Sequence, residues 1–211
     1  MITRYASTSV RRRQIVSAAR KLIAKHGSEH LTVKRIASEI GVSEGAIYRH
    51  FKSKREIISF LVDEIEKLIL ADIERSFRDL SPKTEEVLEK IIKAHISAVE
   101  RRSGMTFQII AEIISLGDKK LNKKIHGVIN KYISRIGDVL ARGRAAGVVR
   151  EDLDLEAAAM LFFGMIQGLI SVWALDHYGF DLEEKYGALW RVYRKVISSP
   201  AVPAPLLANP E

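Results

Sequence analysis

The amino-acid sequence predicts an all-α protein of about nine helices, in which a three-helix head precedes a larger helical body. Apolar residues recur at intervals of three and four along most of the chain, which is the spacing of one helix face. Strict polar–apolar alternation, the pattern of a half-buried strand, is not found. Glycine, proline or a capping residue separates one periodic segment from the next. We therefore expect helix-on-helix packing to form the core.

The chain opens with two helices. The first is expected over about residues 10–26 and ends at Gly27. A short second helix follows Thr32, whose hydroxyl suits the N-cap position. Gly41 then suits the left-handed position that ends this helix.

A third helix follows at once. Ser43 suits its N-cap, and Ile47 and Phe51 face the core four residues apart. The pattern predicts a helix-turn-helix over about residues 32–51, with a recognition helix at about residues 43–51.

The rest of the chain carries six further helical segments. The first begins at the Ser53–Glu56 capping box, and the second begins at Pro82, which suits a first-turn position. The other four are expected over about 105–116, from about Leu121 to Gly147, over about 155–176 with Asp154 as N-cap, and over about 181–198. We expect a DNA-binding domain at 8–68, a body for effector binding and dimerisation at 69–199, and a disordered tail at 200–211.

The positive charge is concentrated in the head. Residues 1–55 hold 13 lysines and arginines against three glutamates, whereas the whole chain has a formal net charge of +8. The body is therefore slightly acidic. A basic module joined to a near-neutral body is typical of nucleic-acid binding, although a solvated basic face has the same composition.

Several functional classes lack their signatures. The absence of cysteine excludes disulfides and thiolate metal sites, and the histidines show no metal-ligand spacing. No catalytic Ser/His/Asp arrangement or phosphate-cradling glycine loop is present. We therefore expect no enzyme, metal or cofactor. No segment gives the ~20 clean apolar residues of a membrane span, and no secretory signal opens the chain, so we expect a cytoplasmic protein without a membrane partner.

The outer face of the third helix has the chemistry for reading DNA. Gly45 and Ala46 allow close approach to base edges, and Arg49 suits guanine or phosphate. The expected contacts on this helix and just after it are Ser43, Glu44, Gly45, Ala46, Tyr48, Arg49, His50 and Lys54. The start of the second helix offers further N–H groups to a phosphate, at Thr32, Val33 and Lys34.

The segment LTVKRIASEIGVSEGAIYRHFKSK, from Leu31 to Lys54, resembles the DNA-binding head of the TetR family of transcriptional regulators. The resemblance extends over about residues 10–60 and is weak after about residue 75. It implies a homodimer that reads a near-palindromic DNA operator and leaves it when the body binds a small molecule. Glu44 departs from what phosphate contact needs. Its carboxylate accepts from cytosine N4 or points to solvent.

The body would then hold the effector pocket, among the helices of about residues 85–175. Polar or aromatic residues on otherwise apolar faces are the candidates: His95, Gln108, Glu112, Asn130, Tyr132, Gln167 and Trp173. A hydrogen-bonded structural role is the alternative for each of them. The abundance of Ile, Leu, Phe and Met favours an apolar or amphipathic effector, such as a lipid, acyl thioester, aromatic compound or drug.

The last two helices would form the dimer interface. Small residues that allow close helix approach, and large aromatic residues beside them, are the candidates: Ala157, Ala158, Gly164, Gly168, Trp190 and Tyr193. Packing within one subunit is the alternative. A TetR-like DNA-binding protein without an effector, in an architectural or division-linked role, would have the same head.

Overall fold

The computed structural model describes residues 7–26, 30–78, 84–101 and 104–198. In these ranges the chain forms nine helices and no strand: α1 (Thr8–His26), α2 (Val33–Glu39), α3 (Glu44–Tyr48), α4 (Lys54–Arg78), α5 (Thr84–Arg101), α6 (Met105–Leu116), α7 (Lys119–Ala145), α8 (Leu155–Leu175) and α9 (Leu182–Ile197). The predicted all-α fold is confirmed. The predictions for Gly27, Pro82 and the tail at 200–211 lie outside the described residues.

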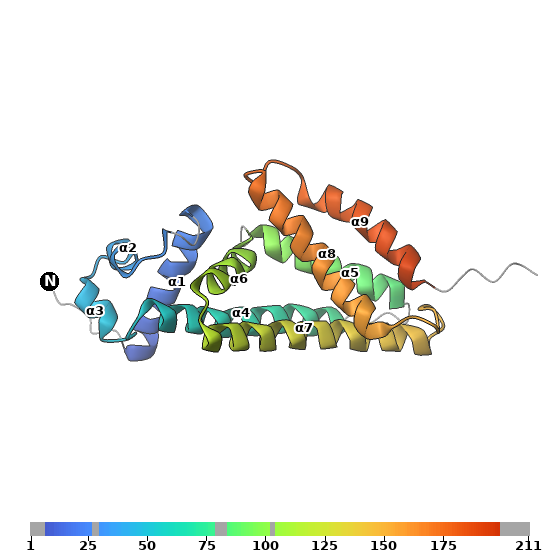
Figure 1. The fold of residues 1–211 in the computed structure, drawn as a ribbon, viewed down its shortest axis with the longest axis horizontal. Helices are drawn as coiled ribbons and strands as arrows, with labels where there is room; N and C mark the ends of the chain where they lie inside the picture. The colour runs from blue at the N-terminus through green and yellow to red at the C-terminus, as the bar shows by residue number, and fades with distance from the viewer. Residues whose placement is uncertain (1–6, 27–29, 79–83, 102–103, 199–211) are drawn as a thin grey trace, which may run out of the picture.

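The long helices α4 and α7 lie side by side and form the base of the molecule (Figure 1). Their exposed faces are joined by ion pairs: the Lys124 ammonium lies 2.7 Å from the Asp63 carboxylate, and Lys131 pairs with Glu66. Helices α1 to α3 lie at one end of this base, while α8 packs across α7 and α9 covers α8. The base therefore connects the head to the body.

The turn between α2 and α3 has the geometry that the sequence predicts. The Thr32 hydroxyl accepts from the Arg35 amide at the start of α2. Gly41 has φ +67°, and the amide of the following residue, Val42, donates to the Ala37 carbonyl at 2.9 Å. Such a glycine-ended helix satisfies its last carbonyls and turns the chain sharply. It directs the chain into α3 at a fixed angle.

Helix α3 is shorter than predicted. It spans Glu44–Tyr48, and the chain from Arg49 to Phe51 continues as a turn in which His50 and Phe51 both donate to the Ile47 carbonyl. Phe51 is fully buried and the Ser53 cap of α4 follows it directly. The chain turns here because Phe51 must point into the core while Ser53, two residues later, caps the start of α4.

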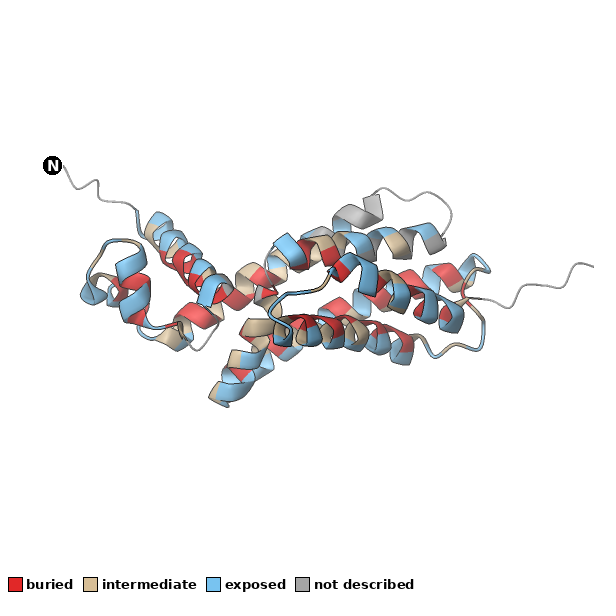
Figure 2. Cartoon of the chain, turned by 90° about the horizontal axis from the view of Figure 1, so that it is seen from above, coloured by how far each residue is buried: buried red, intermediate tan, exposed pale blue. Residues whose placement is uncertain are grey.

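The body and the head share a core. One buried cluster joins α1–α4 to Ile109 and Ile113 of α6 and to Leu121, Ile125 and Val128 of α7. A second cluster holds the remaining core of α5, α7, α8 and α9. Figure 2 shows the buried sides of the helices turned toward their neighbours. The proposed division at residue 68 therefore falls inside α4 and inside a shared core.

Helix α8 corrects one expectation from composition. Its 21 residues, Leu155–Leu175, are long and apolar enough to cross a membrane, and about a third of the stretch is buried (33%). Its only charged residue is Glu156, in the first turn, so the rest of the helix meets a length and composition criterion that we expected no segment of the chain to meet. A core helix of a globular protein meets the same criterion, and α8 packs against α7 and α9.

Candidate functional site

The outer face of α3 is accessible, as a DNA-reading helix requires. Ile47 is buried in the head and holds the helix in place, and the Ser43 hydroxyl accepts from the Ala46 amide at 3.2 Å. Glu44, Gly45 and Arg49 are exposed, and half of the Tyr48 surface is exposed (50%). Gly45 leaves this surface open, because a Cβ placed on it meets nothing closer than 3.9 Å. The protruding groups therefore form one polar face.

Other predicted DNA contacts are less exposed. Val33 is buried, so only its backbone N–H is available, whereas Thr32 and Lys34 beside it are exposed. Ala46 and His50 are half-buried at the margin of the α3 face. The predicted set thus divides into a protruding centre and a recessed margin.

The structure shows a support beneath this face that we did not predict. The Arg12 guanidinium lies over the Phe51 ring, 4.5 Å from its centroid, and 5.2 Å from that of Phe60. It also donates to the Glu56 carboxylate at 3.0 Å. A second Glu56 oxygen accepts from the Lys52 amide at 2.7 Å. Arg12 thus connects α1 to the segment between α3 and α4. In the sequence, the basic run Arg11–Arg13 indicated only positive charge and did not indicate this contact.

The first residues of α4 are bound to the body. The Lys54 ammonium lies 2.6 Å from the Glu112 carboxylate of α6. The Arg55 guanidinium lies 3.4 Å from the carboxylate of Asp118, which also caps α7 by accepting from the Leu121 amide. That hydrogen bond is the main cause of a lowered pKa of Asp118. Glu112, a candidate for the effector pocket, therefore lies at the junction of head and body.

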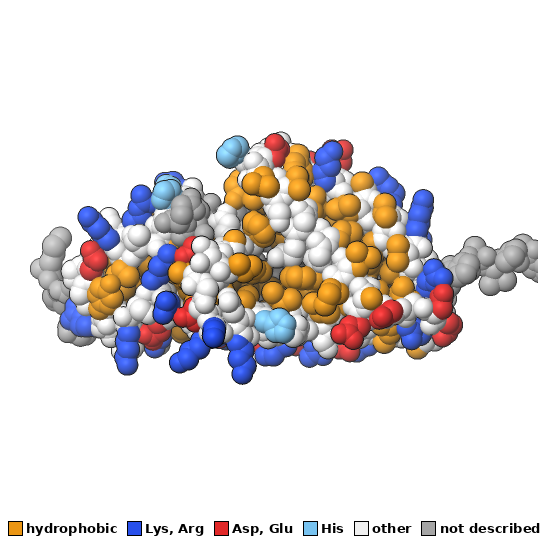
Figure 3. Space-filling model, in the orientation of Figure 1, with side chains coloured by type: hydrophobic (Ala, Val, Ile, Leu, Met, Phe, Trp, Pro, Cys, Tyr) orange, Lys and Arg blue, Asp and Glu red, His pale blue; other side chains and the backbone are white. Residues whose placement is uncertain are grey.

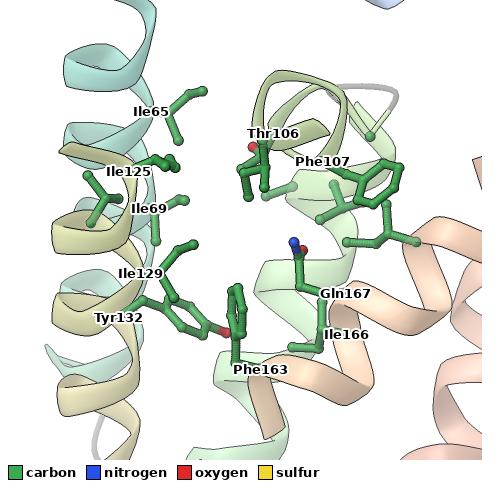
Figure 4. A pocket seen from close by; sticks show the side chains of 16 residues that line it. Ile65, Ile69, Thr106, Phe107, Ile125, Ile129, Tyr132, Phe163, Ile166 and Gln167 are labelled. Atoms are coloured by element: carbon green, nitrogen blue, oxygen red, sulfur yellow. The ribbon is translucent and has the colours of Figure 1, made fainter. Parts of the chain in front are cut away.

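The body contains a narrow apolar cavity between α4, α5, α6, α7 and α8 (Figure 4). It is lined by Ile65, Ile69, Ala98, Val99, Gly104, Thr106, Phe107, Ile110, Ile125, Val128, Ile129, Tyr132, Phe163, Ile166, Gln167 and Ile170. Its volume is about 40 Å³, which holds a few water molecules at most. Figure 3 shows a hollow lined by hydrophobic side chains near the middle of the molecule.

Two predicted pocket residues line this cavity. The rings of Tyr132 and Phe163 lie 5.9 Å apart, and the Gln167 amide reaches in from α8. Burial raises the pKa of the Tyr132 hydroxyl, so this group stays neutral. The cavity therefore offers few polar groups on a hydrocarbon wall.

The other pocket candidates lie elsewhere. Gln108 donates to the Tyr178 hydroxyl at 2.5 Å, and Trp173 is buried and donates to the Phe180 carbonyl at 3.0 Å. Asn130 is exposed and lies 3.5 Å from a ring nitrogen of His126. The side chain of His95 is outside the described part of the structure. The apolar lining residues gave no separate sequence signal, because they have the same types and spacing as core residues.

The predicted dimer residues fall into two groups. Ala157, Gly164 and Gly168 lie on the exposed side of α8. Helices α8 and α9 also expose large apolar side chains: Met160, Leu161, Val172, Leu175, Val192 and Val196. Figure 3 shows hydrophobic side chains gathered over α8 and α9. In other proteins, large exposed apolar patches often belong to association surfaces.

Three predicted dimer residues are instead buried within the subunit. The Tyr193 hydroxyl donates to the Ala158 carbonyl at 3.0 Å and holds α9 on α8. Trp190 packs beside Tyr193, with their rings 6.0 Å apart. Their large rings sit on the buried side of the amphipathic helix α9, so the intramolecular alternative holds for these residues.

Two protein-family descriptions match the chain. "Bacterial regulatory proteins, tetR family" matches residues 15–59, and "YsiA-like protein, C-terminal region" matches residues 51–197. The second match alone spans more than half of the chain. Together the two matches cover the head, the cavity and the exposed side of α8.

Known proteins resemble the chain over most of its length. It is 29% identical to the fatty acid metabolism regulator protein of Bacillus subtilis over 171 residues, and this alignment covers 80% of this chain and 86% of that protein. It is 24% identical over 183 residues to the nucleoid occlusion factor SlmA of Vibrio atlanticus, with coverage of 86% and 93%. The solved structure of FadR from Bacillus subtilis with stearoyl-CoA is 25% identical, with a TM-score of 0.74 and coverage of 88% and 98%.

Proposed function

The chain belongs to the TetR family of bacterial regulatory proteins, and from this premise we propose a dimeric transcriptional repressor that a long-chain apolar effector releases from DNA. The observation that carries the effector class is the cavity, whose wall is almost entirely hydrocarbon. The proposal has three parts: the DNA contact, the dimer and the effector.

The DNA contact is assigned to the face of α3. Ser43, Gly45 and Ala46 at its start are small, so the helix can approach base edges in a major groove about 12 Å wide. Arg49 reads guanine or a phosphate, while Tyr48 and Lys34 hold the phosphate backbone. Glu44 is exposed and either accepts from a cytosine or faces solvent.

The dimer is assigned to the exposed apolar side of α8 and α9. Gly164 and Gly168 lie in a shallow groove with Val172 and Leu189, and no Cβ stands between them and an approaching helix. Two copies related by a two-fold axis would present two α3 helices to one operator. Such symmetry matches a near-palindromic site.

The effector is assigned to the cavity. A hydrocarbon chain would lie against Ile129 and Ile166, and the amide of Gln167 and the hydroxyl of Thr106 would face its polar end. An acyl thioester combines these features. The likeness to the Bacillus subtilis fatty acid metabolism regulator, and to FadR solved with stearoyl-CoA, supports this class.

Effector binding would have to move helices, because the cavity of about 40 Å³ has no room for an acyl chain. Helix α6 supplies Thr106 and Phe107 to the cavity wall and Ile109 and Ile113 to the core shared with the head. A displacement of α6 therefore reaches α1 and α4. The two head positions would change, and with them the fit to the operator.

The proposal is tested with the purified full-length protein. Binding sites are selected from random DNA, and the selected operator is then titrated with long-chain acyl-CoA, acetyl-CoA or free CoA in a gel-shift assay. We expect long-chain acyl-CoA to lower operator binding, while acetyl-CoA and CoA leave it unchanged. Release by polar sugars or metal ions alone would contradict the apolar effector class.

The likeness to SlmA favours a second candidate, a DNA-binding nucleoid-associated role without an effector. The two functions differ in the cavity. A regulator with an effector gains thermal stability with its ligand, whereas an effectorless protein shows no shift with any acyl-CoA. Both functions place the protein on the nucleoid in the cytoplasm, and the relatives named above are regulators or DNA-associated factors.

A further inference from the structure

The start of α4 is held by acids of the body. Lys54 is the last residue of the motif shared with TetR heads, and its ammonium lies 2.6 Å from Glu112. The Glu112 side chain is largely covered, with 12% exposed, whereas 32% of the Lys54 side chain is exposed. Lys54 is therefore still open to solvent on one side.

A DNA phosphate and the Glu112 carboxylate make opposite demands on this ammonium. A phosphate contacted by Lys54 would lie within a few ångströms of a carboxylate, and like charges at that distance repel. In the free protein the carboxylate also neutralises the lysine, which reduces its attraction for DNA. Glu112 thus acts against phosphate binding at this position in both ways.

Glu112 also lies on the helix that lines the cavity. Phe107 and Ile110 of α6 line the cavity. Glu112 follows Ile110 by two residues and pairs with Lys54 of α4. The other basic residue at the start of α4, Arg55, is paired with Asp118, just after α6. The position of α6 therefore sets how closely the Lys54 ammonium is held.

We propose that Glu112 competes with operator phosphate for the Lys54 ammonium, so that a carboxylate on the effector-binding helix limits DNA affinity. The inference rests on the proposed function and concerns its regulation. It assigns Glu112 a role outside both the effector pocket and the DNA-contacting face.

The test is a double-mutant cycle on operator binding. Glu112→Gln keeps the shape of the side chain and removes its charge, and we expect about two- to fivefold tighter binding, the range for ion pairs of this exposure. Lys54→Gln is expected to weaken binding and to lower the salt slope by about one. In the Lys54→Gln background, Glu112→Gln is expected to give a smaller gain, because only the direct repulsion between carboxylate and phosphate is then relieved.

The matched control is Glu66→Gln, which removes the same negative charge and breaks the ion pair to Lys131 on α7. It is expected to leave operator affinity within twofold of the wild type, and far-UV circular dichroism checks that each variant is folded. Unchanged or weaker binding by Glu112→Gln, or an equal gain in the Lys54→Gln background, would overturn the inference. A wild-type protein that selects no DNA would instead overturn the proposed function, and this inference with it.

Discussion

Replacing Ile113 with alanine tests whether head and body are one folding unit. Ile113 is on α6, in the body, yet its side chain is fully buried (0% exposed) in the cluster formed with α1–α4. Truncating a buried isoleucine to alanine costs about 2–5 kcal/mol. For a chain of this size each 1 kcal/mol lowers the Tm by about 2–4 °C, so we expect a fall of about 4–20 °C.

The neighbouring residue gives the matched control. Ile114 is on the same helix, but this residue is 68% exposed. Its replacement by alanine is expected to change stability by no more than about 0.5 kcal/mol, or about 2 °C. The comparison therefore separates the loss of core packing from the change of residue type.

Two optical signals distinguish one unit from two. Both tryptophans, Trp173 and Trp190, lie in the second core cluster, so their fluorescence reports on the body. Circular dichroism reports on all helices. At equal protein concentration we expect Ile113→Ala to lower both midpoints together. If the fluorescence midpoint stays at the wild-type value while part of the dichroism melts early, the two cores unfold separately and the reasoning is wrong.

Three further results are expected. Arg49→Ala lowers operator affinity by about 1–3 kcal/mol in a gel-shift titration, because an exposed guanidinium on α3 is lost. Ile129→Trp fills the cavity and abolishes the thermal shift with long-chain acyl-CoA, whereas Asn130→Trp, on the exposed side of α7, keeps it. Asp118→Asn is less stable than the wild type at pH 7, and the difference narrows as the pH falls through the lowered pKa of Asp118, below its ordinary 3.8.

Each of these has a contrary outcome. Operator affinity of Arg49→Ala equal to that of the wild type would contradict the assignment of the DNA contact to α3. Full ligand response by Ile129→Trp would place the effector outside the cavity. The fold favours the charged form of the Asp118 carboxylate. Its contribution to the free energy of unfolding is therefore present above about pH 4 and is lost as the pH falls through its lowered pKa. A difference that grows on acidification would contradict the role of the Leu121 amide.

The sequence predicts what is decided locally. The Thr32, Ser43 and Asp154 caps and the turn at Gly41 depend on a few adjacent residues, and the structure has them as expected. The length of α3 was overestimated, because a buried Phe51 fits both a helix and the turn that follows it.

Long-range features could not be predicted in this way. The pairing of Lys54 with Glu112 joins residues on separate helices, and nothing in the spacing of the chain indicates it. The cavity wall consists of the same Ile, Val and Phe as the core, so periodicity cannot separate them. Tyr193 has the residue type of an interface, but the register of α9 turns it inward.

The exposed apolar side of α8 has a consequence for how the regulator responds to its own abundance. Side chains such as Met160, Val172 and Leu175 meet water in a single chain, and association through the proposed interface would cover them. Stability then rises with protein concentration by mass action. Below the dissociation constant of the pair, operator occupancy would follow the square of the chain concentration. A small change in synthesis would therefore be converted into a larger change in repression.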